Sequence, residues 1–201
     1  YEISTRDWSS DVCSSDLPRT RAICLVHYGG ISSDIDKVAK YCRQSGLTLI
    51  EDNAHGLNGL YDGRPLGSFG DMSVLSFHET KNITSGEGGA LVINDQKYVT
   101  RAEILREKGT NRSQFFRGQI DKYTWLDLGS SWVMSDMLAG ILWGQINRIE
   151  AVTSQRLEVF NKYLDGLGQW ASDRGVRLPI IPERSVHPGH LFHMRFDSLK
   201  T

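Results

Sequence analysis

AICLVHYGGISSDIDKVAKYCRQSGLTLIED, residues 22–52, is the stretch that indicates the fold. Its apolar run at residues 22–27 is typical of a short buried strand, and the run at residues 47–51 predicts a second one. The polar and apolar residues between them predict a helix over residues 33–46. A strand, a helix and a strand within about 30 residues form a βαβ unit. The sequence therefore predicts an α/β fold with a mostly parallel sheet.

The expected helix has recognisable ends and one apolar face. We expect it to begin at Ser33, with Asp36 three residues later as the partner in a capping box. Gly46 is expected to end it, because glycine tolerates the left-handed conformation that follows many helices. The face expected to pack on the sheet carries Ile35, Val38, Tyr41 and Cys42.

Further patterns extend this unit along the chain. Apolar runs at residues 72–77 and 90–93 predict two more strands, and residues 190–196 resemble a strand. Residues 96–108 are expected to be helical, and residues 135–167 to form one long helix or two. The remaining segments are expected to be irregular: turns at 62–67, a long polar and aromatic loop at 110–128, and a junction with one Gly and two Pro at 174–182.

The composition is that of a globular protein. Hydrophobic residues make up 39% of the 201 residues and charged residues 23%, which excludes a disordered, collagen-like or coiled-coil chain. The net charge of −1 argues against binding nucleic acid or anionic membranes through bulk charge. No apolar run approaches the ~20 residues of a membrane span, and residues 1–17 lack the pattern of a secretory signal. Three irregularly spaced cysteines favour a reducing, cytoplasmic setting.

Two adjacent carboxylates close the second expected strand. Neighbouring strand residues face opposite sides, so Glu51 and Asp52 cannot form a paired-carboxylate site. Asp52 lies where ligands bind in open α/β sheets, at the carboxyl end of a strand. From its position alone, Asp52 is equally well explained as a helix N-cap or an Asx-turn residue.

Lys81 follows the third expected strand and changes the interpretation of Asp52. A loop lysine by itself is usually just solvated, but a lysine amine and a strand-end carboxylate together suit pyridoxal phosphate chemistry. The amine forms a Schiff base with the cofactor aldehyde, and the carboxylate keeps the pyridine nitrogen protonated. At ~4 Å and an effective dielectric of ~20 this attraction is about 4 kcal/mol, enough to raise the pKa of the ring nitrogen by up to ~3. An exposed pair, at ~0–1 kcal/mol, would not suffice, so Asp52 must lie in a cleft.

Several motifs resemble the DegT family of nucleotide-sugar aminotransferases, enzymes with the aspartate-aminotransferase fold. They are EDNAH at residues 51–55, SFHETKN at 76–82 and GEGG at 86–89. The run REKGTNRSQFFRG at residues 106–118, continued by DKYTW at 121–125, is similar to one subgroup of the family. That subgroup aminates a dTDP-linked 4-keto-6-deoxyhexose in the synthesis of enterobacterial common antigen. The likeness extends over about residues 21–196 and is weaker after residue 167.

The resemblance implies a role for each matching residue. Lys81 would be the catalytic Schiff-base lysine, Asp52 would hold the pyridine nitrogen, and Ala54 would pack on the ring. His55 would lie near the ring oxygen, where many relatives have Gln, and Ser76 would donate to the cofactor phosphate. In relatives, an Asn of the neighbouring subunit also binds the cofactor phosphate, and Ser131 occupies the matching position here.

The chain is expected to divide into a tail, whose Ser/Asp repeat has no helix or strand period, and two parts implied by the resemblance, which also implies the partners. Residues 1–17 are expected to be a non-native or disordered tail, similar to translated sequencing-adapter sequence. Residues 18–150 would be the central part of the large, pyridoxal-phosphate-binding domain. Residues 151–201 would be a linker helix and the truncated start of the small domain. The expected partners are a nucleotide-sugar substrate, an amino donor such as glutamate, and a second copy of the chain, with no nucleic acid or membrane.

Other residues leave alternatives open. Arg112 and Arg117 suit either a sugar pyrophosphate or solvent. The aromatic residues near them suit a dimer interface better than a nucleotide base; they are Phe115, Phe116, Tyr123 and Trp125. His190 matches a family position near the substrate. The histidines His27, His55 and His78 lack the spacing of a metal site, so no metal is expected.

Three competing functions are distinguishable. Family members that act as dehydratases have His in place of the lysine, and Lys81 argues against that class. A nicotinamide-dinucleotide domain would need a glycine fingerprint that opens a helix, and residues 86–89 precede a strand instead. The third alternative is an inactive fragment, because the upstream phosphate-binding Ser/Thr segment of the family is missing from these 201 residues.

Overall fold

The computed structural model describes residues 19–197. The tail expected at residues 1–17 lies outside the described residues. Along residues 19–197, no helix is both long and apolar enough to cross a lipid bilayer.

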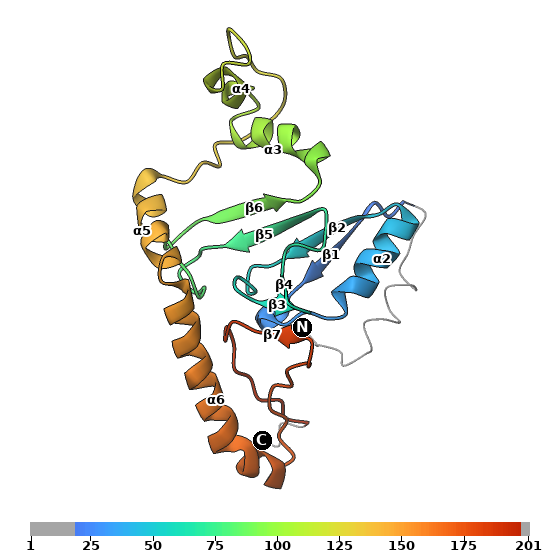
Figure 1. Ribbon diagram of the computed structural model, residues 1–201, viewed down its shortest axis with the longest axis vertical. Helices are drawn as coiled ribbons and strands as arrows, with labels where there is room; N and C mark the ends of the chain where they lie inside the picture. Colours follow the sequence, from blue (N-terminus) through green and yellow to red (C-terminus); the bar gives the residue numbers. More distant parts are fainter. Residues whose placement is uncertain (1–18, 198–201) are drawn as a thin grey trace.

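The main sheet has four strands in the order β1-β2-β5-β6 (Figure 1). β1 (Ala22–Val26), β2 (Thr48–Asp52) and β5 (Met72–Ser76) are parallel. β6 (Gly89–Ile93) pairs with β5 in the antiparallel direction. The structure thus has the expected α/β class with a mostly parallel sheet. The carboxyl ends of the three parallel strands lie on the same edge, so the loops that follow them can meet.

Helix α2 (Ile35–Ser45) packs on one face of this sheet and forms the core with it. Its buried residues, Ile35, Ala39 and Cys42, contact Leu49 of β2 and Leu66. The helix ends as expected at Gly46, which has a left-handed φ of 66°. It begins one residue later than expected, with Asp34 rather than Ser33 as the N-cap residue.

Asp36 explains why the expected capping box is wrong. Its carboxylate accepts hydrogen bonds from the Tyr61 hydroxyl at 3.1 Å and from Arg184 at 2.9 Å. Although burial opposes the change, these contacts lower the pKa of Asp36. The same carboxylate accepts the Lys37 N–H at 3.0 Å, so it joins the first turn of α2 to distant segments rather than forming the expected capping box with Ser33.

The opposite face of the sheet has no helix of the described chain packed on it. Cys24, Val26, Val74 and Leu91 lie on this face, and all four are exposed. Asp52 is on the same face, because it pairs with Val26 and Val74 in register. The strand-end carboxylate therefore borders an open surface rather than the core.

A small second sheet joins the segment around residue 185 to the loop that follows β2. β3 (Leu60–Tyr61) pairs with β4 (Arg64–Pro65) through a turn at Asp62 and Gly63, both with positive φ. It also pairs with β7 (Ser185–Val186). The sequence pattern indicated only turns here, since strands of two residues are too short to show a period.

The remaining helices lead away from the sheet and return (Figure 1). η1 (Tyr28–Gly30) follows β1, and η2 (Gln96–Tyr98) leads into α3 (Val99–Arg106). α4 (Arg112–Phe116) lies inside the segment expected to be a loop. The long helical region divides in two, α5 (Asp136–Ile146) and α6 (Ile149–Asp173).

The strand expected at residues 190–196 is wrong. Within the described chain this segment forms a single bridge, between Arg177 and Arg195. The main sheet places β6, not this segment, beside β5. An alternating pattern forms a strand only where a sheet edge is available to pair with it.

Candidate functional site

The end of β2 presents its two carboxylates in opposite directions, as expected. Glu51 is fully buried, whereas Asp52 is half-buried on the open face. The Asp52 Oδ1 accepts a hydrogen bond from the Ala54 N–H at 3.1 Å, which is an Asx-turn contact. Burial, and secondly the negative charge of Asp52, raises the pKa of the Cys24 thiol. The Asp52 carboxylate thus lies close enough to Cys24 of β1 to influence its thiol.

Glu51 holds the loop after β4 against the end of β2. Its Oε2 lies 2.8 Å from His27 Nε2 and accepts the Gly67 N–H at 2.8 Å. Its Oε1 accepts the N–H groups of Phe69 and Gly70 at 2.7 and 2.6 Å. Burial alone would raise the pKa of Glu51, but these four contacts lower it. This buried carboxylate therefore stabilises the loop, on the side of the strand opposite Asp52.

Lys81 lies in the turn that follows β5. The Lys81 N–H donates to the His78 carbonyl at 3.0 Å, and the His78 N–H donates to Ser76 Oγ at 3.4 Å. The turn therefore begins at the carboxyl end of β5, next to the end of β2. Ser76 is half-buried at this strand end.

The charges of Lys81 and Asp52 both shift the pKa of the His55 imidazole. Burial lowers the pKa of His55, the positive charge of Lys81 lowers it further, and the negative charge of Asp52 raises it. Lys81 and Asp52 are 29 positions apart in the chain, yet both lie within electrostatic range of His55. The structure therefore brings Asp52, Ala54, His55, Ser76 and Lys81 to one edge of the sheet.

A second histidine completes this group. The His190 ring stacks on His55 with 4.1 Å between centroids and an interplanar angle of 27°. His190 Nδ1 lies 2.8 Å from Asn82 Oδ1. The edge of Tyr28 meets His55 on another side, with centroids 5.3 Å apart. Burial, followed by the charges of His55, Lys81 and Arg156, lowers the pKa of His190 to about 4.

Helix α6 fixes the segment that carries His190. Arg156 donates to the carbonyls of Gly189 and His190 at 3.1 and 3.2 Å. Gly189 adopts a φ of 64°, and a Cβ there would lie 3.1 Å from the Arg156 side chain. Beside His190 lies a groove of about 470 Å³, lined partly by Phe160, Tyr163 and Phe192. Sequence patterns do not show Arg156 or Asn82 as site residues, because both contacts join segments far apart in the chain.

Ser131 lies apart from this group. It is exposed and forms a bridge with Glu107, beyond the end of α3. Arg117 there donates to both carboxylate oxygens of Glu103 at 2.8 and 2.7 Å. Arg112 lies over the Phe116 ring, 4.9 Å from its centroid. Both arginines have partners within their own segment.

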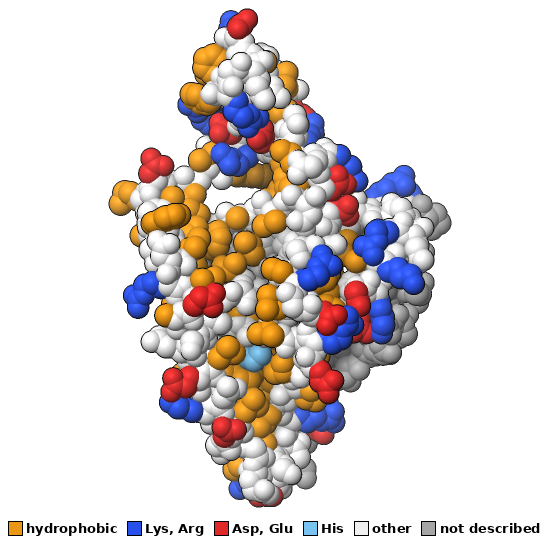
Figure 2. Space-filling model, in the orientation of Figure 1, with side chains coloured by type: hydrophobic (Ala, Val, Ile, Leu, Met, Phe, Trp, Pro, Cys, Tyr) orange, Lys and Arg blue, Asp and Glu red, His pale blue; other side chains and the backbone are white. Residues whose placement is uncertain are grey.

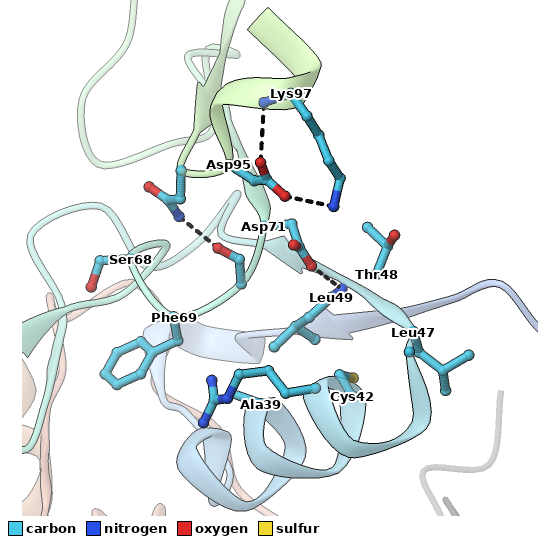
Figure 3. A pocket seen from close by; sticks show the side chains of 14 residues that line it. Ala39, Cys42, Leu47, Thr48, Leu49, Ser68, Phe69, Asp71, Asp95 and Lys97 are labelled. Carbon is cyan, nitrogen blue, oxygen red and sulfur yellow. Dashed lines mark hydrogen bonds and ion pairs between the residues drawn. The ribbon is translucent and has the colours of Figure 1, made fainter.

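The hollow in Figure 3 lies at the other end of β2. Its polar groups serve the backbone: Asp71 accepts the Leu49 N–H at 2.7 Å, and Asn94 donates to the Gly70 carbonyl at 2.8 Å. Lys97 is paired with Asp95 at its rim. None of the lining residues belongs to the group around Lys81.

The chain is similar to known sugar aminotransferases in sequence and in structure. Spore coat polysaccharide biosynthesis protein SpsC of Bacillus subtilis is 29% identical over 186 residues, which are 91% of this chain and 47% of that protein. The aminotransferase TlmJ from Streptoalloteichus hindustanus superposes with a TM-score of 0.83 at 28% identity, covering 94% of this chain and 49% of that one. DesI, solved in the presence of its TDP-sugar product, superposes with a TM-score of 0.80 at 28% identity, covering 94% and 45%.

These matches establish the fold and the family. The chain spans about half the length of the curated relatives it matches. Its α/β fold with a mostly parallel sheet is that of about half of a pyridoxal-phosphate-dependent aminotransferase. The model of the DegT/DnrJ/EryC1/StrS aminotransferase family matches residues 16–200. The chain therefore belongs to the DegT/DnrJ/EryC1/StrS aminotransferase family.

Proposed function

We propose that this protein is a pyridoxal-phosphate-dependent nucleotide-sugar aminotransferase. It would move an amino group from an amino acid, glutamate, to the 4-keto carbon of a dTDP-4-keto-6-deoxyhexose. The observation that carries the proposal is the placement of Lys81 and Asp52. In a chain of this family, Asp52 ends β2, Lys81 lies in the turn after the adjacent parallel strand β5, and the charges of both shift the pKa of His55.

The residues at this edge fit pyridoxal phosphate. Asp52 is half-buried, so its charge is less screened than on an open surface, and it would hold the pyridine nitrogen. Ala54 would contact the ring, His55 its oxygen, and Ser76 the phosphate. The open sheet face beside Asp52 leaves room for a flat group. The bound cofactor supplies an electron sink for the carbon that gains or loses a proton.

Two residues of this chain would handle charge and protons. Asp52 would keep the ring nitrogen protonated by staying ionised. Lys81 would hold the cofactor through its amine and, once released, would move a proton as the general base. Both tasks need the amine and the carboxylate close to one planar group, at different positions around it.

The proposed substrate rests on the resemblance of residues 106–125 to one subgroup. The member that this run resembles is dTDP-4-amino-4,6-dideoxygalactose transaminase, which acts in enterobacterial common antigen synthesis. The TDP-sugar in the DesI structure supports a dTDP-linked substrate. The alternative is another nucleotide keto-sugar within the same family. An amination assay with dTDP-4-keto-6-deoxyglucose and its UDP-linked counterpart separates the two, since activity with the UDP sugar alone would contradict the dTDP assignment.

We also propose a cytoplasmic homodimer in which Ser131 would contact the phosphate of the cofactor bound by the neighbouring subunit. Ser131 lies apart from its own Lys81 group, which suits a contribution across an interface. Hydrophobic side chains gather over α5 in Figure 2. Met137 and Trp143 of this helix are 82% and 69% exposed. Exposed apolar patches of this kind mark protein interfaces.

The 201 residues alone are proposed to bind the cofactor weakly. They span about half the length of their relatives, and the Asp52 face of the sheet is open. A titration with pyridoxal phosphate, followed by absorbance, should show no tight stoichiometric binding. Tight 1:1 binding by these residues would contradict this part of the proposal.

Borohydride reduction of the full-length enzyme tests the assignment of Lys81. Wild-type protein should retain the cofactor covalently after reduction, and peptide mapping should find it on Lys81. The Lys81→Ala variant should lose this trapping and at least about 1000-fold in activity, because it lacks the nucleophile and the base. Lys97→Ala is the matched control, since Lys97 lies at the other end of the sheet. Trapping that persists at another lysine in Lys81→Ala would overturn the proposal.

A further inference from the structure

The imidazole rings of His55 and His190 are stacked, and one nitrogen of each ring has a hydrogen-bond partner. Each of these hydrogen bonds leads, directly or through a side chain, to a backbone group. A backbone N–H can only donate a hydrogen bond and a backbone carbonyl can only accept one. Such anchors determine which ring nitrogen carries the proton in a neutral histidine, independently of how hydrogens are placed.

The network around His190 begins at the Pro188 carbonyl. This carbonyl accepts a hydrogen bond at 2.9 Å, so the Asn82 side-chain atom facing it is the amide nitrogen Nδ2. The other end of the amide, Oδ1, therefore faces His190 Nδ1 at 2.8 Å and can only accept. His190 Nδ1 must carry a proton to donate to it. In the neutral ring, Nε2 is then unprotonated and is an acceptor.

The network around His55 leads to the opposite result. The Gly29 N–H donates to His55 Nδ1 at 3.2 Å, so that nitrogen is unprotonated. In the neutral ring, His55 Nε2 carries the proton and is a donor. Among residues 19–197, neither Nε2 has a hydrogen-bond partner from the protein, and both atoms are free to bind another group.

Both rings are neutral near pH 7, chiefly because they are partly buried and secondly because of the charges around them. Lys81 acts on both rings and Arg156 acts on His190, and each opposes protonation. Burial acts in the same direction. Asp52 favours protonation of His55, but the pKa of His55 is still lowered.

We propose that Asn82 is a positioning residue that holds His190 as a hydrogen-bond acceptor, beside His55 as a donor, next to Lys81. His190 Nε2, as an acceptor, suits a hydroxyl group that donates a hydrogen bond to it, while the Nε2–H of His55 suits the cofactor ring oxygen. The ligand class is therefore a polyhydroxylated substrate such as a sugar. This use of the pair rests on the proposed function, whereas the two tautomers rest on the protein network alone.

Long-range ¹H–¹⁵N NMR of histidine side chains reads the tautomers directly. With signals assigned through His55→Phe and His190→Phe, His190 should show a protonated Nδ1 and His55 a protonated Nε2 at pH 7.5. Exposed His193 serves as an internal reference. A wild-type His190 with the proton on Nε2 would overturn the inference.

Two substitutions of Asn82 sharpen the test. Asn82→Leu removes the acceptor, so His190 should lose its Nδ1–H preference while His55 and His193 keep their signals. Asn82→Asp keeps an acceptor and adds a charge, so the tautomer should remain and the pKa of His190 should rise by about 1 to 3. If Asn82→Leu does not fold, Asn82→Asp still decides. An unchanged pKa of His190 in Asn82→Asp would count against the contact.

Kinetics of the full-length enzyme separate this inference from the proposed function. Asn82→Leu should lower kcat/KM for the keto-sugar about 10-fold, the loss expected for one oriented hydrogen bond. Borohydride trapping at Lys81 should remain. Unchanged kcat/KM with an altered tautomer would overturn the role given to Asn82. Wild-type enzyme without trapping at Lys81 would instead overturn the proposed function and leave the tautomers standing.

Discussion

Glu51 is the residue on which the geometry of the β2 end depends most. Its carboxylate accepts hydrogen bonds from three backbone N–H groups and contacts His27, and both Glu51 and His27 are fully buried. A buried acceptor with so many partners is costly to replace, since each orphaned donor loses its compensation for leaving water.

Glu51→Gln should lower the free energy of unfolding by about 3 kcal/mol, because one oxygen becomes a donor facing other donors. Urea denaturation measures this loss. The control is Glu158→Gln on the exposed face of α6, where the pair with Lys162 is open to solvent and the change should stay within about 0.5 kcal/mol. Equal effects of the two substitutions would show that the Glu51 contacts stabilise nothing.

His190 makes the stability depend on pH. Its folded pKa of about 4 lies below the usual 6.5. The unfolded chain therefore binds more protons between these values, and stability rises with pH across that window. The contribution is fully present above pH 6.5 and is lost as the pH falls toward 4.

The size of this effect should be about 1–2 kcal/mol after allowing for solvent screening. Urea unfolding at pH 7.5 and pH 4.5 measures it as a difference between wild type and His190→Phe, in which the other groups cancel. The variant should lose less stability on acidification. A larger acid loss in His190→Phe would show that the buried ring is not what titrates.

At the level of elements, the contact between η1 and the segment before His190 depends on a glycine. Gly30 has a φ of 80°, and a Cβ there would lie 2.5 Å from Pro188 Cδ and 2.8 Å from the His55 carbonyl oxygen. Three segments therefore approach each other only because residue 30 has no side chain. Gly46, at the end of α2, has a similar φ of 66° but no heavy atom within 4 Å of the position of its Cβ.

This pair of glycines gives a matched comparison. Gly46→Ala should destabilise the protein by about 1 kcal/mol, the cost of a left-handed backbone alone. Gly30→Ala should cost about 3 kcal/mol or more, since overpacking is added to that strain. Thermal denaturation of both variants measures the difference. If Gly30→Ala is no worse than Gly46→Ala, the packing of these segments is looser than described.

Elements with a clear hydrophobic period could be predicted, and short or tertiary ones could not. The helix over Ile35–Ser45 and the four strands of the main sheet follow local patterns. β3, β4 and β7 have two residues each and no readable period. The expected capping box failed because Asp36 binds Tyr61 and Arg184, which lie far away in the chain. The strand expected at residues 190–196 did not form because it does not pair with an edge of the main sheet.

At the scale of the whole molecule, the exposed hydrophobic side chains of α5 indicate that the protein self-associates. Its exposed side chains include Met137, Ile141 and Trp143, the last 69% exposed. The double substitution Met137→Ser with Trp143→Ser should weaken dimerisation at least about 10-fold, because each buried large side chain contributes more than about 1 kcal/mol.

Sedimentation velocity over a concentration series measures this association. Ile180→Ser is the control, since Ile180 is as exposed but lies in the segment between α6 and β7. A monomer at every concentration, or equal effects of both changes, would contradict an interface on α5.

The sequence by itself determined the βαβ unit, the opposite directions of Glu51 and Asp52, and the position of Lys81 after a strand. Each of these follows from periodicity within one segment, because side-chain direction repeats along a strand or helix. Only the tertiary structure decided that His190 stacks on His55, that Asn82 and Arg156 hold it, and that Glu51 binds the loop at residues 67–70. Those contacts join segments up to 135 positions apart. They exist because β7 pairs with β3 and α6 returns along the molecule, and no local pattern carries that information.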